Sequence, residues 1–177
     1  RMNTDIDIWD QNRKRLFEYP KIEYTKRSLN SLIKSINFLK NKYPSINVKT
    51  IIVDDNSSTE NLNVIKKVID GNIIEIINLD YSKYKEKISE QKNKETFANL
   101  ASLLQSFEVG KNTGEDLIYF IEDDYLHFEP MLEEMVASYE RIASQLNKDI
   151  FMCPSDYPYL YMNNVKTNVL IGNKRHW

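Results

Sequence analysis

The stretch Ile51-Ile52-Val53-Asp54-Asp55-Asn56-Ser57-Ser58 joins an apolar, β-branched run directly to two acids and a polar turn. Residues 48–53 are predicted to form a strand, because β-branched side chains are enriched in strands. Residues 57–60 fit a capping box, which predicts a helix that buries Leu62, Ile65, Val68 and Ile69. Asn56 tolerates the positive φ of a tight turn. Both acids therefore lie beyond the carboxyl end of a strand, where open α/β sheets bind ligands.

Strand and helix patterns alternate on both sides of this stretch. Apolar and alternating runs predict further strands at residues 4–10, 73–77, 117–121, 150–153 and 168–171. Helical spacing predicts helices from Thr25 to just before Pro44, from Phe97 to near Gly110, and from Pro130 to Leu146. The lysine-rich residues 81–95 are interpreted as a solvated connection or, alternatively, a flap beside a phosphate ligand. The alternation predicts an α/β sandwich, with helices flanking a mostly parallel central sheet, in a single domain of residues 1–177.

The composition excludes several classes of protein. With 177 residues, 24 Lys+Arg and 26 Asp+Glu, the chain has the length of one domain and a net charge of −2. A charge so close to zero argues against a dedicated nucleic-acid binder. Cys153 is the only cysteine, which excludes a disulfide scaffold. Residues 1–16 lack a signal peptide's apolar stretch, and no run of about 18 apolar residues occurs, so we expect a soluble, cytoplasmic protein.

A second acidic cluster follows the apolar run at residues 117–121. Residues 115–134 hold eight acidic side chains and no Lys or Arg, and the adjacent carboxylates of Glu122, Asp123 and Asp124 repel one another. A divalent cation removes that repulsion. Mg²⁺ and Mn²⁺ commonly take one or two carboxylates and the oxygens of a diphosphate as ligands. Asp124 is therefore predicted to bind a metal with a nucleotide. For Asp55 the alternative is a structural role in capping the following helix.

The two acidic motifs together resemble those of GT-A glycosyltransferases, especially the inverting family 2 enzymes. Residues 51–58 are similar to their strand, acid and turn signature, and Ile121-Glu122-Asp123-Asp124-Tyr125-Leu126-His127 resembles the EDD variant of their metal-binding DxD motif. The resemblance spans about residues 4–153. It implies a Rossmann-like hexosyltransferase that uses a nucleotide-diphosphate sugar and Mn²⁺ or Mg²⁺. By this resemblance, Asp10 and either Asp54 or Asp55 would contact the nucleoside. Glu122 and Asp123 would contact the ribose and the sugar, and Asp124 would bind the metal.

The residues after Cys153 supply further candidates. Asp156, in a proline-bounded turn, is the best remaining carboxylate for the base of an inverting reaction, although the resemblance places that base near or beyond Trp177. His176 is a candidate metal ligand, and Lys174 or Arg175 is a candidate for binding diphosphate.

The resemblance also sets expectations for the substrates and the surroundings of the protein. A chain of 177 residues is short for this family, which implies a truncated or minimal acceptor-binding portion. We expect a UDP-sugar as donor and a glycan or lipid-linked acceptor, as in polysaccharide biosynthesis. Contact with the inner face of the membrane is expected to be peripheral at most.

Two other functions are compatible with acids placed after a strand. One is a non-catalytic or truncated module that binds a nucleotide sugar without turning it over. The other is a receiver-type phosphoacceptor domain, which is expected to have an acid pair in its first strand and a Lys-Pro after a late strand. The acid pair here follows the second predicted strand and no such Lys-Pro occurs, which disfavours the receiver domain.

Overall fold

The computed structural model describes residues 1–5, 19–88 and 94–152. The chain divides into two compact units, Arg1–Glu129 and Pro130–Trp177. Several sequence predictions fall outside the described residues, namely Asp10, Cys153, Asp156, Arg175, His176 and the strand at residues 168–171. Among the described helices, none has the length and apolar character needed to cross a membrane.

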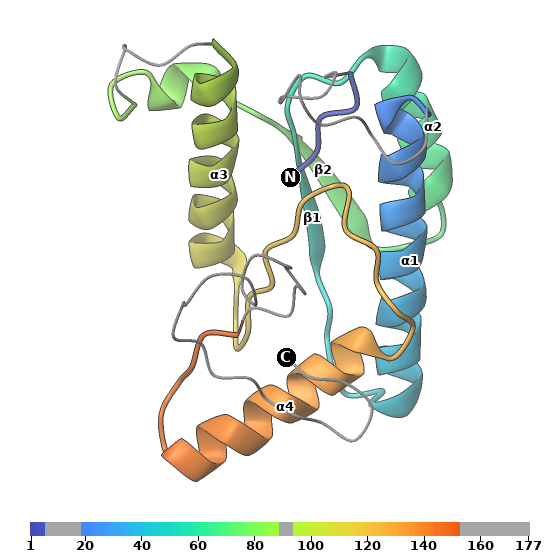
Figure 1. Ribbon diagram of the computed structural model, residues 1–177, viewed down its shortest axis with the longest axis vertical. Helices are drawn as coiled ribbons and strands as arrows, with labels where there is room; N and C mark the ends of the chain where they lie inside the picture. The colour runs from blue at the N-terminus through green and yellow to red at the C-terminus, as the bar shows by residue number, and fades with distance from the viewer. Residues whose placement is uncertain (6–18, 89–93, 153–177) are drawn as a thin grey trace, which may run out of the picture. The chain divides into compact units, whose positions relative to one another are not determined.

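The first unit alternates helices with two short strands (Figure 1). Its elements are α1 (Lys21–Lys42), β1 (Thr50–Asp54), α2 (Thr59–Ile69), β2 (Ile74–Asn78), the short 3₁₀ helix η1 (Tyr81–Tyr84) and α3 (Lys94–Thr113). The second unit contains α4 (Met131–Leu146), which ends at Asn147 in the left-handed conformation, at φ 52°. The described part of the chain is therefore a mixed α/β structure, and its predicted helices and its two strands near residues 48–53 and 73–77 are confirmed.

The strands of the first unit are parallel. β1 pairs with β2 in a register that runs from Thr50 opposite Ile74 to Asp54 opposite Asn78. On the other edge of β1, the Met2 N–H donates to Val53 O and Met2 O accepts from the Asp55 N–H, both at 2.8 Å. The backbone amino group of Arg1 donates in turn to Ile121 O at 3.0 Å. The described sheet thus has two strands, β1 and β2, with an isolated bridge at Met2 on the outer edge of β1, and residue 121 contacts the chain beside that bridge.

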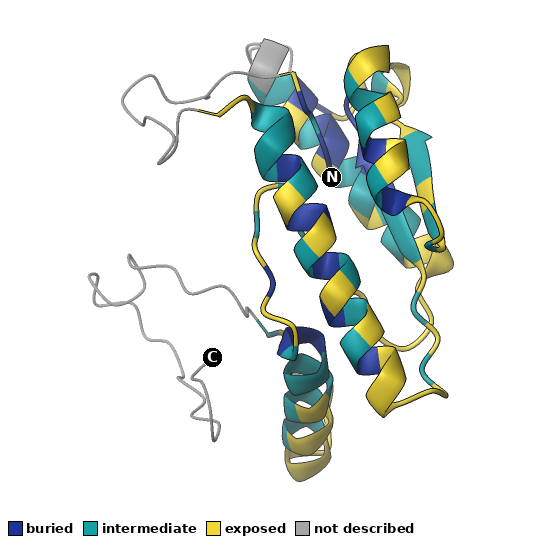
Figure 2. Cartoon of the chain, turned by 90° about the vertical axis from the view of Figure 1, so that its right-hand side faces the viewer, coloured by how far each residue is buried: buried dark blue, intermediate teal, exposed yellow. Residues whose placement is uncertain are grey.

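The two faces of β1 are covered by different helices. Ile52 packs in one apolar cluster with Leu29 of α1 and Ile65 of α2, whereas the next residue, Val53, packs with Ala101 of α3. Adjacent residues of a strand point to opposite faces, so α1 and α2 cover one face and α3 covers the other (Figure 1). Figure 2 shows buried and exposed residues alternating along the helices, as amphipathic packing requires.

The predicted strand at residues 117–121 is wrong. Residues 116–121 have no regular secondary structure, and Ile118 and Phe120 are 49% and 44% exposed. Their side chains lie against two glycines of α3: a Cβ on Gly110 would meet the Phe120 ring at 2.9 Å, and one on Gly114 would meet Ile118 at 2.6 Å. These side chains are thus covered by α3, while the backbone of residues 117–121 forms no strand with a neighbour among the described residues.

Other predicted strands and boundaries also differ from the structure. Thr4 and Asp5 form a bend, so the described start of the predicted strand at residues 4–10 is wrong, and the chain pairs with β1 through Met2 instead. Residues 150–152 form no strand. α1 begins at Lys21, four residues before the predicted cap Thr25, because Pro20 fixes an extended backbone in front of it.

The lysine-rich segment is not simply a solvated connection. Within its described part, Tyr84 and Ile88 are 0% and 6% exposed. Both belong to the apolar cluster on the α3 face of the sheet, together with Val53 and Leu79. The sequence prediction weighed the lysines of this segment and overlooked its apolar positions.

Candidate functional site

The turn after β1 is organised by its own acid and by Asn56. Asp54 Oδ2 accepts a hydrogen bond from the Ser57 N–H at 3.1 Å. Asn56 has a φ of 52°, which confirms the tight turn predicted from the sequence. Ser58 caps α2, and its Oγ accepts from the Asn61 N–H at 3.4 Å. The strand therefore leads into the helix through the predicted turn, with Ser58 rather than Ser57 as the cap.

Asp54 is a buried carboxylate that lacks a partner on one oxygen. Asp54 is 1% exposed, and its Oδ1 has no hydrogen-bond partner among the described residues. Burial raises the pKa of Asp54 above the ordinary value of 3.8, against the opposing effect of hydrogen bonds from Ser57. The nearby segment contributes a second such atom, Thr4 Oγ1. A buried polar atom without a partner costs free energy.

We expect Asp54→Asn to raise the free energy of unfolding at neutral pH by about 1 kcal/mol, because it removes the charge and retains an oxygen for the Ser57 N–H. A folded-state pKa above the unfolded value means that the wild type gains stability as the pH falls through the folded pKa. The advantage of the variant should therefore shrink as the pH approaches 3.8. Urea denaturation at several pH values measures this difference.

Asp80→Asn is the matched control for that experiment. Asp80 accepts hydrogen bonds from Ser82, which lower the pKa of Asp80. Replacing Asp80 should not stabilise the protein at neutral pH. A loss of stability in Asp54→Asn at every pH would contradict the prediction.

Asp55 connects the turn to two other segments. Its Oδ2 accepts from Asn3 Nδ2 at 3.1 Å, and its Oδ1 accepts from the hydroxyl of Tyr81. Burial, followed by the bond to Asp55, raises the pKa of Tyr81 to about 12. Tyr81 therefore remains a proton donor throughout the physiological pH range. Asp55 is 7% exposed, and its side-chain bonds go to Asn3 and Tyr81, whereas Ser58 caps α2, so the capping role considered for Asp55 is not what the structure shows.

Asp5 supplies a further carboxylate from the N-terminal segment. It accepts hydrogen bonds from Ser58 Oγ at 3.0 Å and from the Ser58 N–H. An acid at the start of α2 is favoured by the helix dipole. Sequence reasoning missed Asp5, Asn3 and Tyr81. Only Tyr81 had a signal, because it follows the predicted strand at residues 73–77; Asn3 and Asp5 lie at the amino end of the predicted strand at residues 4–10.

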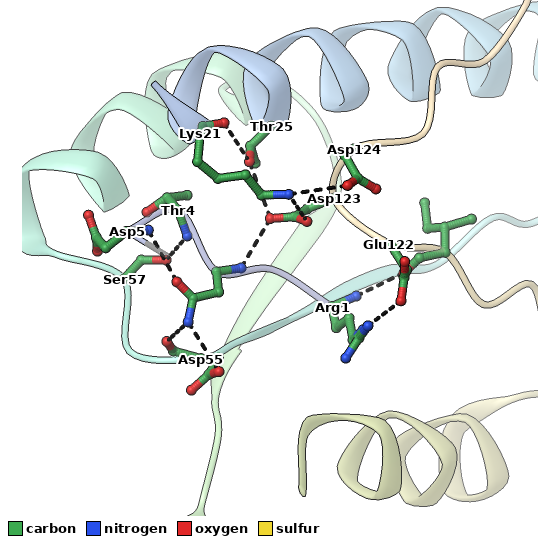
Figure 3. Close-up of polar contacts among 12 residues, drawn as sticks. Arg1, Thr4, Asp5, Lys21, Thr25, Asp55, Ser57, Glu122, Asp123 and Asp124 are labelled. Atoms are coloured by element: carbon green, nitrogen blue, oxygen red, sulfur yellow. Dashed lines mark hydrogen bonds and ion pairs between the residues drawn. The ribbon is translucent and has the colours of Figure 1, made fainter. Parts of the chain in front are cut away.

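The three carboxylates of residues 122–124 have different environments (Figure 3). Asp123 accepts from the Asn3 N–H at 3.1 Å and from the Thr25 hydroxyl at 3.2 Å, and it pairs with the Lys21 ammonium at 2.8 Å. Its side chain is 13% exposed. Asp124 meets the same ammonium at 3.4 Å and is 50% exposed. Asp123 is thus held on several sides, whereas Asp124 keeps half of its surface toward solvent.

Two cations from distant parts of the sequence neutralise this acidic cluster. Lys21 lies between Asp123 and Asp124, and the Arg1 guanidinium pairs with Glu122, whose side chain is 45% exposed. The sequence argument for a metal considered only charges near residues 115–134, so it could not include these partners. Part of the repulsion among the acids is therefore relieved by the chain itself.

Asp123 and Asp124 supply two carboxylates at one point, so a divalent cation there would need further ligands from a substrate or water. No group of three or more Asp, Glu, His or Cys residues suited to holding a metal occurs within residues 1–5, 19–88 and 94–152. However, the Lys21 ammonium marks a position where a cation meets two carboxylates, those of Asp123 and Asp124. Mg²⁺ commonly takes one or two protein carboxylates and completes its coordination with substrate phosphates and water.

His127 anchors the segment that follows the acids. Its backbone N–H donates to Ser31 Oγ of α1 at 3.0 Å, and its Nε2 is paired with the Tyr119 hydroxyl at 3.1 Å. Burial lowers the pKa of His127, which favours the neutral ring at physiological pH. The hydrogen bonds of His127 therefore connect this segment to Tyr119 and to Ser31 of α1.

The structure brings most of the described candidates to one edge of the sheet. Asp54 and Asp55 lie at the end of β1, and residues 3–5 link them to Asp123 through Asn3. Comparisons with family models, curated proteins and solved structures gave no match for this chain. The functional interpretation therefore depends on this geometry and on the resemblance of the two acidic motifs.

Proposed function

We propose that this chain is a metal-dependent glycosyltransferase of the GT-A type, which takes its sugar from a nucleotide diphosphate with inversion. The observation that carries the proposal is the meeting of three acid-bearing segments at the carboxyl edge of the parallel strands. These segments are residues 3–5, residues 54–58 and residues 122–124.

The order of the segments supports a ligand site at this edge. From residues 1–3 the chain continues to β1 and β2 on one side, and it later returns to residue 121 on the opposite side. In open α/β sheets ligands bind beyond the carboxyl ends of the strands, which is where Asp54 and Asp55 follow β1. Asn3 links Asp55 to Asp123 at this edge.

Exposure supports different roles for the acids in this proposal. Asp124 and Glu122 have half-exposed side chains and are available to a ligand. Asp54, Asp55 and Asp123 are largely buried and hold the loops that form the edge. A metal bound by Asp124 and by oxygens of the diphosphate would stabilise the negative charge that develops on the leaving diphosphate.

The remaining roles stay predictions. Asp156 as base, His176 as metal ligand, and Arg175 and Asp10 as nucleotide contacts lie outside the described residues. A UDP-sugar donor and a glycan or lipid-linked acceptor follow from the resemblance. A cytoplasmic location, with at most peripheral membrane contact, also stays a prediction.

We expect one of UDP, GDP and CDP to bind in the presence of Mn²⁺ and to lose affinity in EDTA. Asp124→Asn should weaken the metal-dependent binding by at least about tenfold, because the substitution removes a charged oxygen ligand. Glu115→Gln is the matched control: it removes one negative charge from the same acidic run at a position outside the cluster of residues 122–124. Isothermal titration calorimetry measures all of these affinities.

Absence of binding by all three nucleotides, or equal binding by wild type and Asp124→Asn, would contradict the proposal. Release of UDP from UDP-sugars, measured in the same preparation, separates the transferase from a non-catalytic module. Tight, metal-dependent binding without turnover would identify the chain as a non-catalytic module that binds the nucleotide sugar.

A further inference from the structure

Lys21 occupies an unusual position for a surface lysine. It is the first residue of α1, yet its side chain is only 16% exposed. Its ammonium lies 2.8 Å from Asp123 Oδ1 and 3.4 Å from Asp124 Oδ2. Figure 3 shows the side chain reaching from the helix into the space between the two carboxylates. The Lys21 ammonium is thus itself a cation that is bound by two carboxylates.

The two carboxylates that contact Lys21 differ in how easily they can exchange the ammonium for another cation. Asp123 has further hydrogen bonds from Asn3 and Thr25, which keep its carboxylate in place without the lysine. Asp124 has the longer contact and a half-exposed side chain, so it can turn to another cation at little cost. A flexible lysine side chain can also withdraw toward solvent.

We infer that Lys21 is a built-in counter-ion that competes with the divalent cation for Asp123 and Asp124. The inference rests on the proposed function, because it concerns the metal of that site. In the free protein the ammonium neutralises the two acids and holds α1 against residues 122–124. When the divalent cation binds, the ammonium leaves both carboxylates and withdraws toward solvent. Lys21 therefore sets the metal affinity of the protein to a weak value when no nucleotide is present.

Lys21→Gln should bind Mn²⁺ at least about tenfold more tightly than the wild type, because one positive charge near the two carboxylates is removed. Electron paramagnetic resonance of free Mn²⁺ gives the affinity directly, without a nucleotide and without turnover. Lys21→Arg keeps the charge and should stay close to the wild type. Lys26→Gln is the matched control: it makes the same charge change on the same helix, but Lys26 pairs with Glu23 at 2.6 Å.

Equal or weaker Mn²⁺ binding by Lys21→Gln would overturn the inference, as would an equal gain in Lys26→Gln. Failure of both the wild type and Lys21→Gln to bind Mn²⁺ would also overturn it. Loss of nucleotide binding, in contrast, would remove the proposed function and leave the difference in Mn²⁺ affinity as it stands. The two failures are therefore distinguishable.

A second measurement needs no variant. Amine-reactive labelling of the wild-type protein, followed by peptide mass spectrometry, should show that saturating Mg²⁺ increases the modification of Lys21. Lys26 should be modified equally with and without Mg²⁺. Unchanged labelling of Lys21 would overturn the inference even if Lys21→Gln fails to fold.

Discussion

Asp123→Ala is expected to lower the free energy of unfolding by about 3 kcal/mol, because it removes one partner of a largely buried ion pair. The substitution removes the nearer of the two carboxylates from the Lys21 ammonium and leaves the buried Thr25 hydroxyl only its bond to Lys21 O. It also removes the acceptor of the Asn3 N–H, which ties the N-terminal segment to the acidic run. Chemical denaturation followed by circular dichroism measures the change.

The adjacent acid is the control for this prediction. Asp124→Ala should change the free energy of unfolding by less than about 0.5 kcal/mol, since exposed ion pairs contribute little. Its side chain is half exposed, and its contact with Lys21 is 3.4 Å long. Similar destabilisation by both substitutions would show that the carboxylates are equivalent, and would contradict the division into a structural and a ligand-facing acid.

That division could not be made from the sequence, where residues 122–124 are three neighbouring acids. What separates Asp123 from Asp124 is contact with Asn3, Lys21 and Thr25, which lie about a hundred residues earlier in the chain. Hydropathy and charge patterns describe neighbours in sequence. They cannot assign partners that the fold brings together, so the acidic cluster was predicted to need a cation from outside the protein.

Local features were predicted more successfully, because their causes are local. The positive φ of Asn56 and the position of Gly71 after α2, at φ 74°, follow from what each residue's backbone permits. The amphipathic spacing of α2 and the β-branched run of β1 were likewise sufficient. The strand expected at residues 117–121 is absent because an apolar run predicts that its side chains are covered, here by α3, and does not specify backbone pairing with a neighbouring strand.

The lysine-rich segment shows the same limitation at a position that matters for the site. Tyr81 donates to Asp55, and η1 places it there because Tyr84, three residues later, is fixed in the core. Tyr84 packs with Val53 and Ala101. The anchor of this segment is thus an aromatic ring among lysines, which a reading of charge alone overlooked.

Tyr84→Ala is therefore expected to lower the free energy of unfolding by about 3–5 kcal/mol, the usual cost of truncating a buried aromatic side chain. Tyr84 is 0% exposed, so the cavity left by the ring has no solvent to fill it directly. Because η1 loses its anchor, the contact of Tyr81 with Asp55 should weaken as well. Denaturation measures the first effect, and nucleotide titration of the folded variant measures the second.

Tyr84→Phe separates the ring from its hydroxyl. The hydroxyl donates to Glu108 Oε2 at 2.8 Å, and its loss should cost only about 1 kcal/mol. Glu108 keeps the hydrogen bonds of Lys83 and Lys87, which are the largest causes of its pKa of about 2, so no carboxylate is left without a partner. Nucleotide affinity should then equal that of the wild type. If Tyr84→Phe destabilised the protein as much as Tyr84→Ala, the hydroxyl network and not the packing of the ring would hold Tyr81 beside Asp55.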